Sequence, residues 1–251
     1  MRIEPVPCLR DNYAYLIIAD DGQAAVVDPG CAAPIQAAVA AAGARLVAAW
    51  CTHHHPDHTG GVAALRAAVP ALEVVAHGVD AERFAGVTRR VADGDTVELG
   101  ALRASIVFNP GHTLGAVTFV VGDAAFTGDT LFGAGCGRLF EGTAPQFHAS
   151  LMRLAALPAH TRVFFGHEYT AANLAFATAV EPANVELMAR RASTPATSTP
   201  STIATERATN PFLRAAEPAV IAAAQAQDPS CDGSPAAVFA TLRRWKDGFR
   251  A

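Results

Sequence analysis

In the first two thirds of the chain, segments with the apolar pattern typical of strands alternate with segments that have the pattern typical of helices. Apolar, β-rich runs predict strands over residues 46–51, 102–108, 116–126 and 162–165, and the first of these is expected to be buried. Gly122-Asp123 divides the third run into two strands. Alanine- and leucine-rich stretches predict helices over residues 34–42, 62–69 and 146–156. This order of elements predicts a mixed α/β fold.

The strand pattern fades beyond about residue 170, and helix patterns take its place. The expected helices span residues 171–180, 183–191, 215–226 and 235–247. Between the second and third of these, residues 193–202 are rich in serine, threonine and proline, so we expect an ordered surface loop there. We therefore predict two domains, residues 1–169 and residues 170–251.

Potential metal ligands directly follow the first apolar run, which ends at Cys51. They are His53, His55, Asp57 and His58. A strand that ends just before them would direct their side chains into a cleft. Imidazole and carboxylate groups together suit zinc, iron or manganese, whereas closed structural zinc sites often use thiolates. His54 lies between these ligands, and we expect it to point the other way.

Three further candidates recur in a similar setting, each after an apolar run and beside a glycine. They are His112, Asp129 and His167. A glycine beside a ligand allows the backbone to turn sharply and to approach a metal closely. A single Gly-His or Gly-Asp pair is typical of an ordinary turn. Their recurrence after several strands predicts one shared site.

Seven ligands are too many for one tetrahedral ion, but they suit two ions that share a carboxylate. A natural division assigns His53, His55 and His112 to one ion, and Asp57, His58 and His167 to the other. Asp129 would bridge them, because a carboxylate has two oxygens whereas an imidazole offers one free nitrogen to a metal. Each ion would keep an open position for water, which is the mark of a catalytic site.

The pattern His-x-His-x-Asp-His over residues 53–58, with the distant His, Asp and His, resembles that of the metallo-β-lactamase superfamily. Further segments are similar to the glyoxalase II (hydroxyacylglutathione hydrolase) family. They span residues 52–61, 135–143, 166–170, 210–214 and 242–247. The resemblance therefore covers essentially the whole chain. It implies an αββα sandwich with a dinuclear site at one edge and a C-terminal helical domain.

The resemblance also implies an activity, the hydrolysis of the thioester S-D-lactoylglutathione to D-lactate and glutathione. A metal-bridged hydroxide would attack the thioester, since a bound metal lowers the pKa of water from about 15.7 to about 7. Asp57 and Asp129 would be the catalytic carboxylates. We expect two divalent ions, with zinc first and iron or manganese as alternatives. The alternative function is that of another hydrolase of the superfamily, acting on a different thioester or a lactone.

The same resemblance implies residues that bind the substrate, a small-molecule glutathione thioester. They are Arg138, Phe140, Tyr169, Arg243 and Lys246. Arg243 and Lys246 would hold a carboxylate of glutathione, and they share one face of the expected helix because they are three residues apart. At Phe140 the family often has tyrosine. A phenyl ring can pack against the tripeptide, but it cannot donate a hydroxyl hydrogen bond.

Some residues allow more than one interpretation. Asp28 begins Asp-Pro-Gly, a strong turn signal, but it could equally be a carboxylate that orients a ligand imidazole. We expect Asn12 and Tyr13 to be structural. We expect Cys136 to be a small buried residue that packs in the core.

The charge and composition of the chain limit the classes of partner that we expect. The net charge of −4 argues against a nucleic-acid partner, which would need a cationic surface. No stretch of about 20 apolar residues predicts a membrane span. The five cysteines show no paired spacing and the N-terminus lacks a signal-peptide core, so we expect a cytoplasmic protein. We also expect a monomer.

Overall fold

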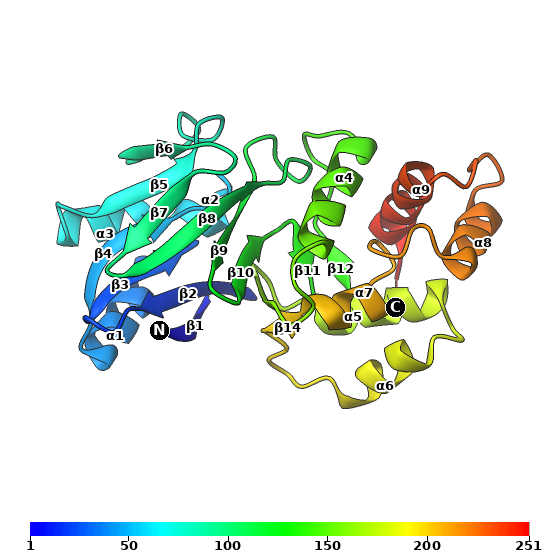
Figure 1. Ribbon diagram of the computed structural model, residues 1–251, viewed down its shortest axis with the longest axis horizontal. Helices are drawn as coiled ribbons and strands as arrows, with labels where there is room; N and C mark the ends of the chain where they lie inside the picture. The colour runs from blue at the N-terminus through cyan, green and yellow to red at the C-terminus, as the bar shows by residue number, and fades with distance from the viewer. Residues whose placement is uncertain (251) are drawn as a thin grey trace. The chain divides into compact units, whose positions relative to one another are not determined.

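The computed structural model describes residues 1–250 and divides into two compact units. Unit 1 contains residues 1–108 and 114–128, and unit 2 contains residues 109–113 and the described residues from 129 onward. The chain is traced from its blue N-terminus to its red C-terminus in Figure 1. The domain boundary expected after residue 169 stays a prediction.

The first sheet of unit 1 has the strand order β1-β2-β3-β4-β5-β6. Its strands are β1 (Arg2–Cys8), β2 (Asn12–Ile18), β3 (Gln23–Val27), β4 (Arg45–Trp50), β5 (Glu73–His77) and β6 (Arg89–Val91). The first three strands pair antiparallel and the last three continue parallel from β3. Parallel neighbours need a crossover connection. Helix α1 (Ala32–Ala42) lies between β3 and β4 in the chain, and α2 (Pro56–Thr59) and α3 (Val62–Ala68) lie between β4 and β5.

The second group of strands in unit 1 is an antiparallel meander. It contains β7 (Thr96–Leu99), β8 (Leu102–Phe108), β9 (Val117–Val121) and β10 (Ala124–Gly128). The turn between β9 and β10 contains Gly122, whose φ of 58° suits glycine, so the predicted division of this apolar run is confirmed.

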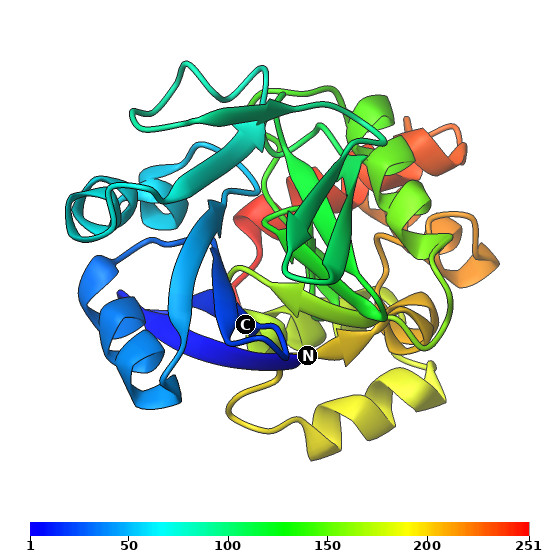
Figure 2. The same cartoon turned by 60° about the vertical axis from the view of Figure 1, so that its left-hand side comes forward.

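Both faces of the first sheet are covered, because β2 is buried along its whole length. On one face Leu16 belongs to an apolar cluster with Ile35 of α1 and Leu65 of α3, and both helices lie along this face in Figures 1 and 2. On the other face the Tyr15 ring lies 5.6 Å from that of Phe126 in β10. Unit 1 therefore has a helical layer and two sheet layers.

Unit 2 is mainly helical. Its helices are α4 (Ala144–Ala155), α5 (Thr170–Val180), α6 (Val185–Ser193), α7 (Ile203–Thr209), α8 (Pro218–Gln227) and α9 (Pro235–Gly248). Its strands form two short antiparallel pairs, β11 (Leu131–Phe132) with β12 (Gly135–Cys136), and β13 (Arg162–Phe165) with β14 (Ser201–Thr202). Helix α4 packs against α9, as seen in Figure 1, through Phe147 and Phe239, whose ring centroids are 5.5 Å apart.

A buried carboxylate in unit 2 holds the β11–β12 hairpin against α7. Glu206 accepts hydrogen bonds from the backbone N–H of Ala134 at 2.8 Å and from Asn210 at 3.1 Å. Asn210 also donates to the Gly135 carbonyl at 2.9 Å. The charge of Glu206 is balanced by Arg190, 2.6 Å away. The helical segment therefore fixes the hairpin whose ends carry Asp129 and Arg138.

Most predicted helices are confirmed to within a few residues, and the α/β class is confirmed. Helix α1 ends at Gly43, whose φ of 62° is left-handed, as the sequence predicts. Helix α6 begins two residues later than predicted, because the Asn184 side chain caps it by accepting from the N–H of Leu187. The sequence missed α7, in which two of the seven residues are threonine, a weak helix former. No helix within residues 1–250 is long and apolar enough to cross a membrane.

Gly30 lies where the segment before α1 meets the ligand loop. A Cβ at this position would lie 2.0 Å from the Asp57 carbonyl oxygen. We predict that Gly30→Ala lowers the free energy of unfolding by about 1–3 kcal/mol, because backbone must move to relieve the overlap. Chemical denaturation of both proteins would measure it. Gly78→Ala is the matched control, since nothing lies within 4 Å of a Cβ there. Equal stability of the two variants would contradict this packing.

Candidate metal centre

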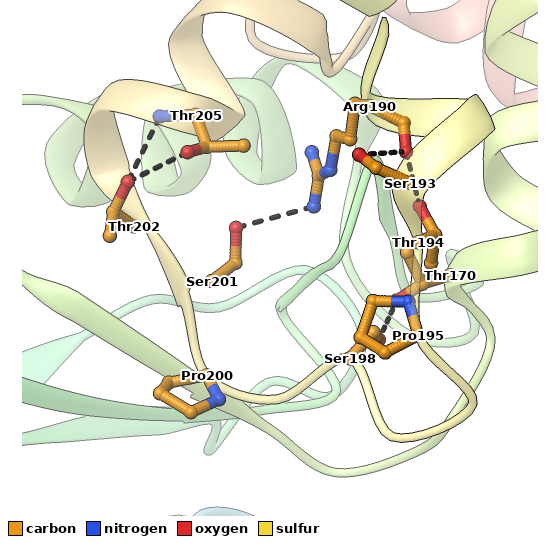
Figure 3. Close-up of a pocket in the computed structure, with 10 residues that line it drawn as sticks. All are labelled: Thr170, Arg190, Ser193, Thr194, Pro195, Ser198, Pro200, Ser201, Thr202 and Thr205. Carbon is orange, nitrogen blue, oxygen red and sulfur yellow. Dashed lines mark hydrogen bonds between the residues drawn. The ribbon is translucent and has the colours of Figure 1, made fainter.

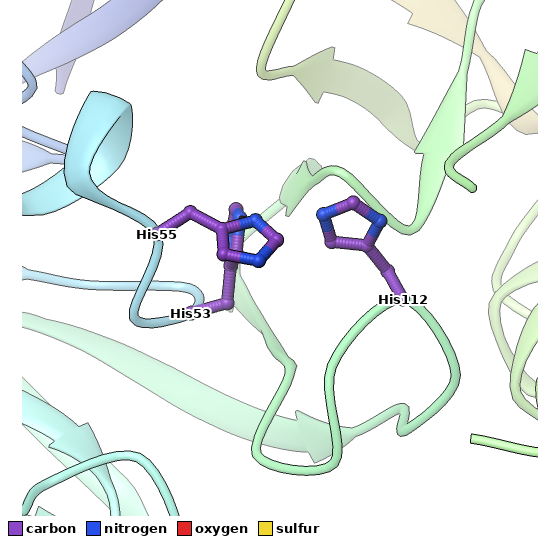
Figure 4. A group of neighbouring side chains, drawn as sticks. All are labelled: His53, His55 and His112. Atoms are coloured by element: carbon purple, nitrogen blue, oxygen red, sulfur yellow. Dashed lines mark hydrogen bonds between the residues drawn. The ribbon is translucent and has the colours of Figure 1, made fainter. Parts of the chain in front are cut away.

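The ligand loop of unit 1 begins just after β4, and His55 immediately precedes α2. His53 and His55 lie on this loop in Figure 4, which also draws His112 on the segment after β8. The Nε2 atom of His53 is 3.1 Å from the Nδ1 atom of His55. Two nitrogens on one tetrahedral zinc ion are about 3.4 Å apart, given Zn–N bonds of about 2.0–2.1 Å. This pair therefore suits one ion.

The Asp28 carboxylate orients the next ligand, His58. Its Oδ2 atom lies 3.0 Å from Nδ1 of His58 and accepts a hydrogen bond from the Thr52 hydroxyl at 2.7 Å. Its Oδ1 atom accepts from the Thr52 backbone N–H at 2.7 Å. An imidazole held through Nδ1 presents Nε2 to a metal. Asp28 also forms the turn, since its carbonyl accepts from the Gly30 N–H at 2.8 Å, so both interpretations of its role hold.

Asp57 lies in the first turn of α2 and is held from β2. Asn12 donates a hydrogen bond to the Asp57 carboxylate at 2.9 Å. The same carboxylate oxygen, Oδ2, lies 3.5 Å from Nε2 of His58. Unit 1 therefore brings together the four ligands that the sequence predicts for it.

Unit 2 holds the other three ligands around a single carboxylate oxygen. Oδ2 of Asp129 lies 3.5 Å from Nε2 of His112 and 3.4 Å from Nε2 of His167. All three residues are buried. One oxygen thus lies close to the metal-binding nitrogens of two histidines that the sequence assigns to different ions.

Backbone groups set the orientation of His112. Its Nδ1 atom lies 2.9 Å from the carbonyl oxygen of Arg138, an acceptor that fixes the proton on Nδ1 and leaves Nε2 for a metal. Gly137 makes this approach possible, because a Cβ there would lie 2.0 Å from the Asp129 carbonyl oxygen and 2.9 Å from Nδ1 of His112. The Gly-Cys-Gly-Arg segment is therefore part of the support of the ligands.

The donor chemistry of both groups fits divalent metal ions. Imidazole nitrogens and carboxylate oxygens are the ligands that zinc, iron and manganese accept in open sites. A cluster of buried carboxylates and imidazoles needs a cation or protons, because buried charges are costly when they are not compensated. These residues therefore support the binding of divalent metal.

The predicted substrate residues beside the ligands present aromatic surface and one exposed cation. The Tyr169 ring stacks on that of His167, with centroids 4.7 Å apart and planes 8° from parallel. The Phe140 ring is exposed, and its centroid lies 5.2 Å from that of His112. The Arg138 side chain is 68% exposed. Tyr169 and Phe140 would thus contact a substrate beside the same group of histidines.

The two predicted cations of α9 have different settings. Arg243 is buried and donates to the carbonyl oxygens of Cys136 at 2.9 Å and of Gly137 at 3.3 Å. Lys246 is half-buried, and its ammonium donates to the Ala172 carbonyl oxygen at 3.1 Å. Burial and the nearby Arg243 guanidinium lower the pKa of Lys246 to about 8. Arg243 therefore supports the hairpin, whereas Lys246 is a half-buried cation with a lowered pKa of about 8.

Comparisons with known proteins agree with this geometry. The model of the metallo-beta-lactamase superfamily matches residues 9–167, and that of the hydroxyacylglutathione hydrolase C-terminus matches residues 168–249. A hydroxyacylglutathione hydrolase of Xanthomonas campestris pv. campestris is 48% identical over the full length of both chains. This chain belongs to the hydroxyacylglutathione hydrolase family. The recognition made from the sequence is confirmed.

Solved structures show the same fold. ETHE1 from Myxococcus xanthus superposes with a TM-score of 0.67 at 29% identity, over 84% of each chain. TTHA1623 in a di-iron-bound form superposes with a TM-score of 0.65 at 28% identity, over 84% of this chain and 100% of that one. The metallo-β-lactamase fold with a C-terminal hydroxyacylglutathione hydrolase region is thereby confirmed.

Two residues that support the ligands have no distinct signal in the sequence. Asn12, expected to be only structural, holds Asp57. Asp80 is fully buried and accepts from the backbone N–H of His54 at 2.9 Å, with the His54 ring 3.1 Å away. His54 is therefore directed at Asp80, which fixes the middle of the ligand loop. Neither contact could be found from local pattern, because the partners are 45 and 26 residues apart.

Cys136 is buried beside Arg243, as expected of a packing residue. Burial raises the pKa of the Cys136 thiol to about 11, although the Arg243 charge opposes this. A raised pKa favours the protonated thiol, which suits a packing residue.

A separate hollow of about 200 Å³ in unit 2, drawn in Figure 3, is lined by hydroxyl groups of the loop between α6 and α7. Arg190 is its cation and donates to the Ser201 hydroxyl at 3.2 Å. Its charge is already balanced by Glu206. The hollow therefore offers no uncompensated charge to a ligand.

Asp28→Asn tests how this carboxylate supports His58. An amide can no longer accept at both oxygens, so the His58 imidazole loses its fixed tautomer. We predict metal affinity lower by about 10- to 100-fold, measured by competition with a chelator. Asp21→Asn is the control, because Asp21 is exposed and bonds only within its own turn. Unchanged affinity in Asp28→Asn would contradict the role of this carboxylate.

Proposed function

We propose that this protein hydrolyses S-D-lactoylglutathione to D-lactate and glutathione at a centre of two divalent metal ions. The observation that carries the proposal is the position of the Asp129 oxygen, about equally distant from His112 and His167. Family membership supports the substrate, because relatives 48% identical over the whole chain are named hydroxyacylglutathione hydrolases.

Seven side chains would hold the two ions. The first ion would be bound by His53, His55 and His112, the second by Asp57, His58 and His167, and Asp129 would bridge them. Asp57 and Asp129 are the carboxylates we assign to catalysis. When bound, the ions lower the pKa of water to about 7 and so supply a hydroxide nucleophile at neutral pH. Zinc is the first expectation, and iron or manganese would suit the same donors.

The other residues orient the ligands and the substrate. Asp28 and the Arg138 carbonyl hold the imidazoles of His58 and His112 with Nε2 free. Arg138 and Lys246 are the cations proposed for the two carboxylates of glutathione, with Arg243 behind them. Tyr169 supplies a hydroxyl. Phe140 lacks the hydroxyl of the family tyrosine, so binding would lose about 0.5–1.5 kcal/mol.

The setting we propose is that of a cytoplasmic monomer that acts on a small molecule, without a nucleic-acid or membrane partner. The net charge of −4 supports this, because a polyanionic partner would be repelled. Positive charge is instead concentrated locally, at Arg138, Arg243 and Lys246.

The proposal is tested by hydrolysis of S-D-lactoylglutathione, other thioesters and a lactone, with elemental analysis of the same sample. We expect the glutathione thioester to be preferred, with about two equivalents of metal per chain. Preference for a lactone or for a thioester without glutathione would instead assign the protein to another activity of the superfamily.

Asp129→Ala tests the bridge. The variant loses the oxygen shared by two ligand histidines, so we predict that metal content falls together with kcat, by about 10²-fold or more in kcat. Elemental analysis and steady-state kinetics would measure both. Asp123→Ala, in the turn between β9 and β10, is the control. Full activity with two bound ions in Asp129→Ala would exclude a bridging role.

The pH dependence tests Lys246. Its pKa of about 8 means that the ammonium, and with it the attraction for a carboxylate, is lost as the pH rises through 8. We predict that kcat/KM for S-D-lactoylglutathione falls above about pH 8 relative to that for a truncated, uncharged thioester. In Lys246→Ala the ratio should be lower and independent of pH. The same alkaline fall in this variant would show that another group titrates.

A further inference from the structure

One carboxylate lies among the cations proposed for substrate binding. Asp247 is in the last turn of α9, and its Oδ1 atom lies 3.0 Å from Nη2 of Arg243. The same oxygen lies 4.0 Å from Nε of Arg138, which belongs to the segment after β12. Asp247 is 46% exposed, so a dissolved anion can reach the same place.

Arg243 is held in this arrangement by several contacts. Besides Asp247 it binds the carbonyl oxygens of Cys136 and Gly137, and its guanidinium lies 5.2 Å from the centroid of the Phe212 ring. Its side chain is only 6% exposed. Within the cluster formed by Arg138, Arg243 and Asp247, the pair of Arg243 with Asp247 is therefore the fixed part.

Arg138 is the part that can exchange. Its side chain is 68% exposed, and its distance of 4.0 Å from Asp247 marks a weak ion pair. Exposed pairs of this kind contribute little, so a better placed carboxylate can replace Asp247 as the partner.

We propose that Asp247 is an internal counter-ion that competes with the substrate carboxylate for Arg138 and thereby lowers the affinity for glutathione thioesters. This inference rests on the proposed function, since it assumes an anionic substrate. The physical basis is that a negative charge beside a cationic site offsets its attraction for any incoming anion. Such an offset weakens as salt screens the charges.

The test compares Asp247→Asn with the native protein in binding S-methylglutathione, a thioether that cannot be hydrolysed as a thioester. The amide keeps the shape and an acceptor for Arg243 but removes the charge. Isothermal titration at low ionic strength and pH 6.5, where Lys246 is protonated, should give a Kd about two- to tenfold lower for the variant. The difference should shrink in high salt.

Asp228→Asn is the matched control. Asp228, which follows α8, pairs with Arg244 of α9 at 2.8 Å, so the variant removes the same charge from an ion pair that does not include Arg138, Arg243 or Asp247. We expect its Kd to equal that of the native protein. An equal gain in both variants would mean that only net charge matters, and it would overturn the inference.

Unchanged or weaker binding by Asp247→Asn would also overturn it. Weaker binding would mean that Asp247 orients the arginines or binds the ammonium group of S-methylglutathione. If neither protein binds S-methylglutathione, competition for Arg138 is likewise excluded. Hydrolysis of S-D-lactoylglutathione, measured on the same samples, separates the two proposals. Tighter binding by the variant without hydrolysis by the native protein would leave the counter-ion role standing and refute the proposed function.

Discussion

The structure depends on one buried carboxylate oxygen that lies within 3.5 Å of two imidazole nitrogens. Such a group of acceptors is unfavourable away from water unless a cation or protons compensate it. In two of the predicted ligand histidines, Nδ1 is directed at an acceptor, Asp28 for His58 and the Arg138 carbonyl for His112. In these two histidines the other nitrogen, Nε2, is the atom that a metal would require, so the way the imidazoles are held supports metal binding.

The helical part of the chain supports the predicted metal ligands as well as carrying the cations proposed for the substrate. Glu206 and Asn210 hold the β11–β12 hairpin from one side, and Arg243 binds the carbonyl oxygens at its end. This segment continues into Gly137, which allows the close approach to His112. A loss of packing among the C-terminal helices would therefore disturb the metal ligands, even though no helix from α5 to α9 carries one of the seven.

The features that could be predicted from the sequence are those that depend on neighbouring residues. All seven predicted ligands follow apolar runs, and three of them, His112, Asp129 and His167, stand beside a glycine, so pattern and chemistry together were enough to propose them. Asn12 and Asp80 could not be predicted, because their roles arise from contacts between distant segments. The sequence allowed two roles for Asp28, as a turn residue or as a carboxylate that orients an imidazole, and in the structure its carbonyl and its side chain fill both. Helical spacing placed Arg243 and Lys246 on one face, but spacing cannot show that Arg243 is buried on backbone carbonyls.

The burial of Arg243 changes how the proposed recognition of the substrate would be divided among the three cations. Because Arg243 is occupied by the hairpin, we propose that Arg138 and Lys246 meet the two carboxylates of the substrate. An exposed guanidinium suits bidentate binding of a carboxylate, whereas an ammonium is a compact point charge. The Lys246 ammonium lies near two aromatic rings, 5.4 Å from the centroid of Phe176 and 5.8 Å from that of Phe249, as in a cation–π contact. The only lysine among nineteen basic residues is thus in a setting that suits an ammonium, and the same burial that shapes this setting makes its charge depend on pH.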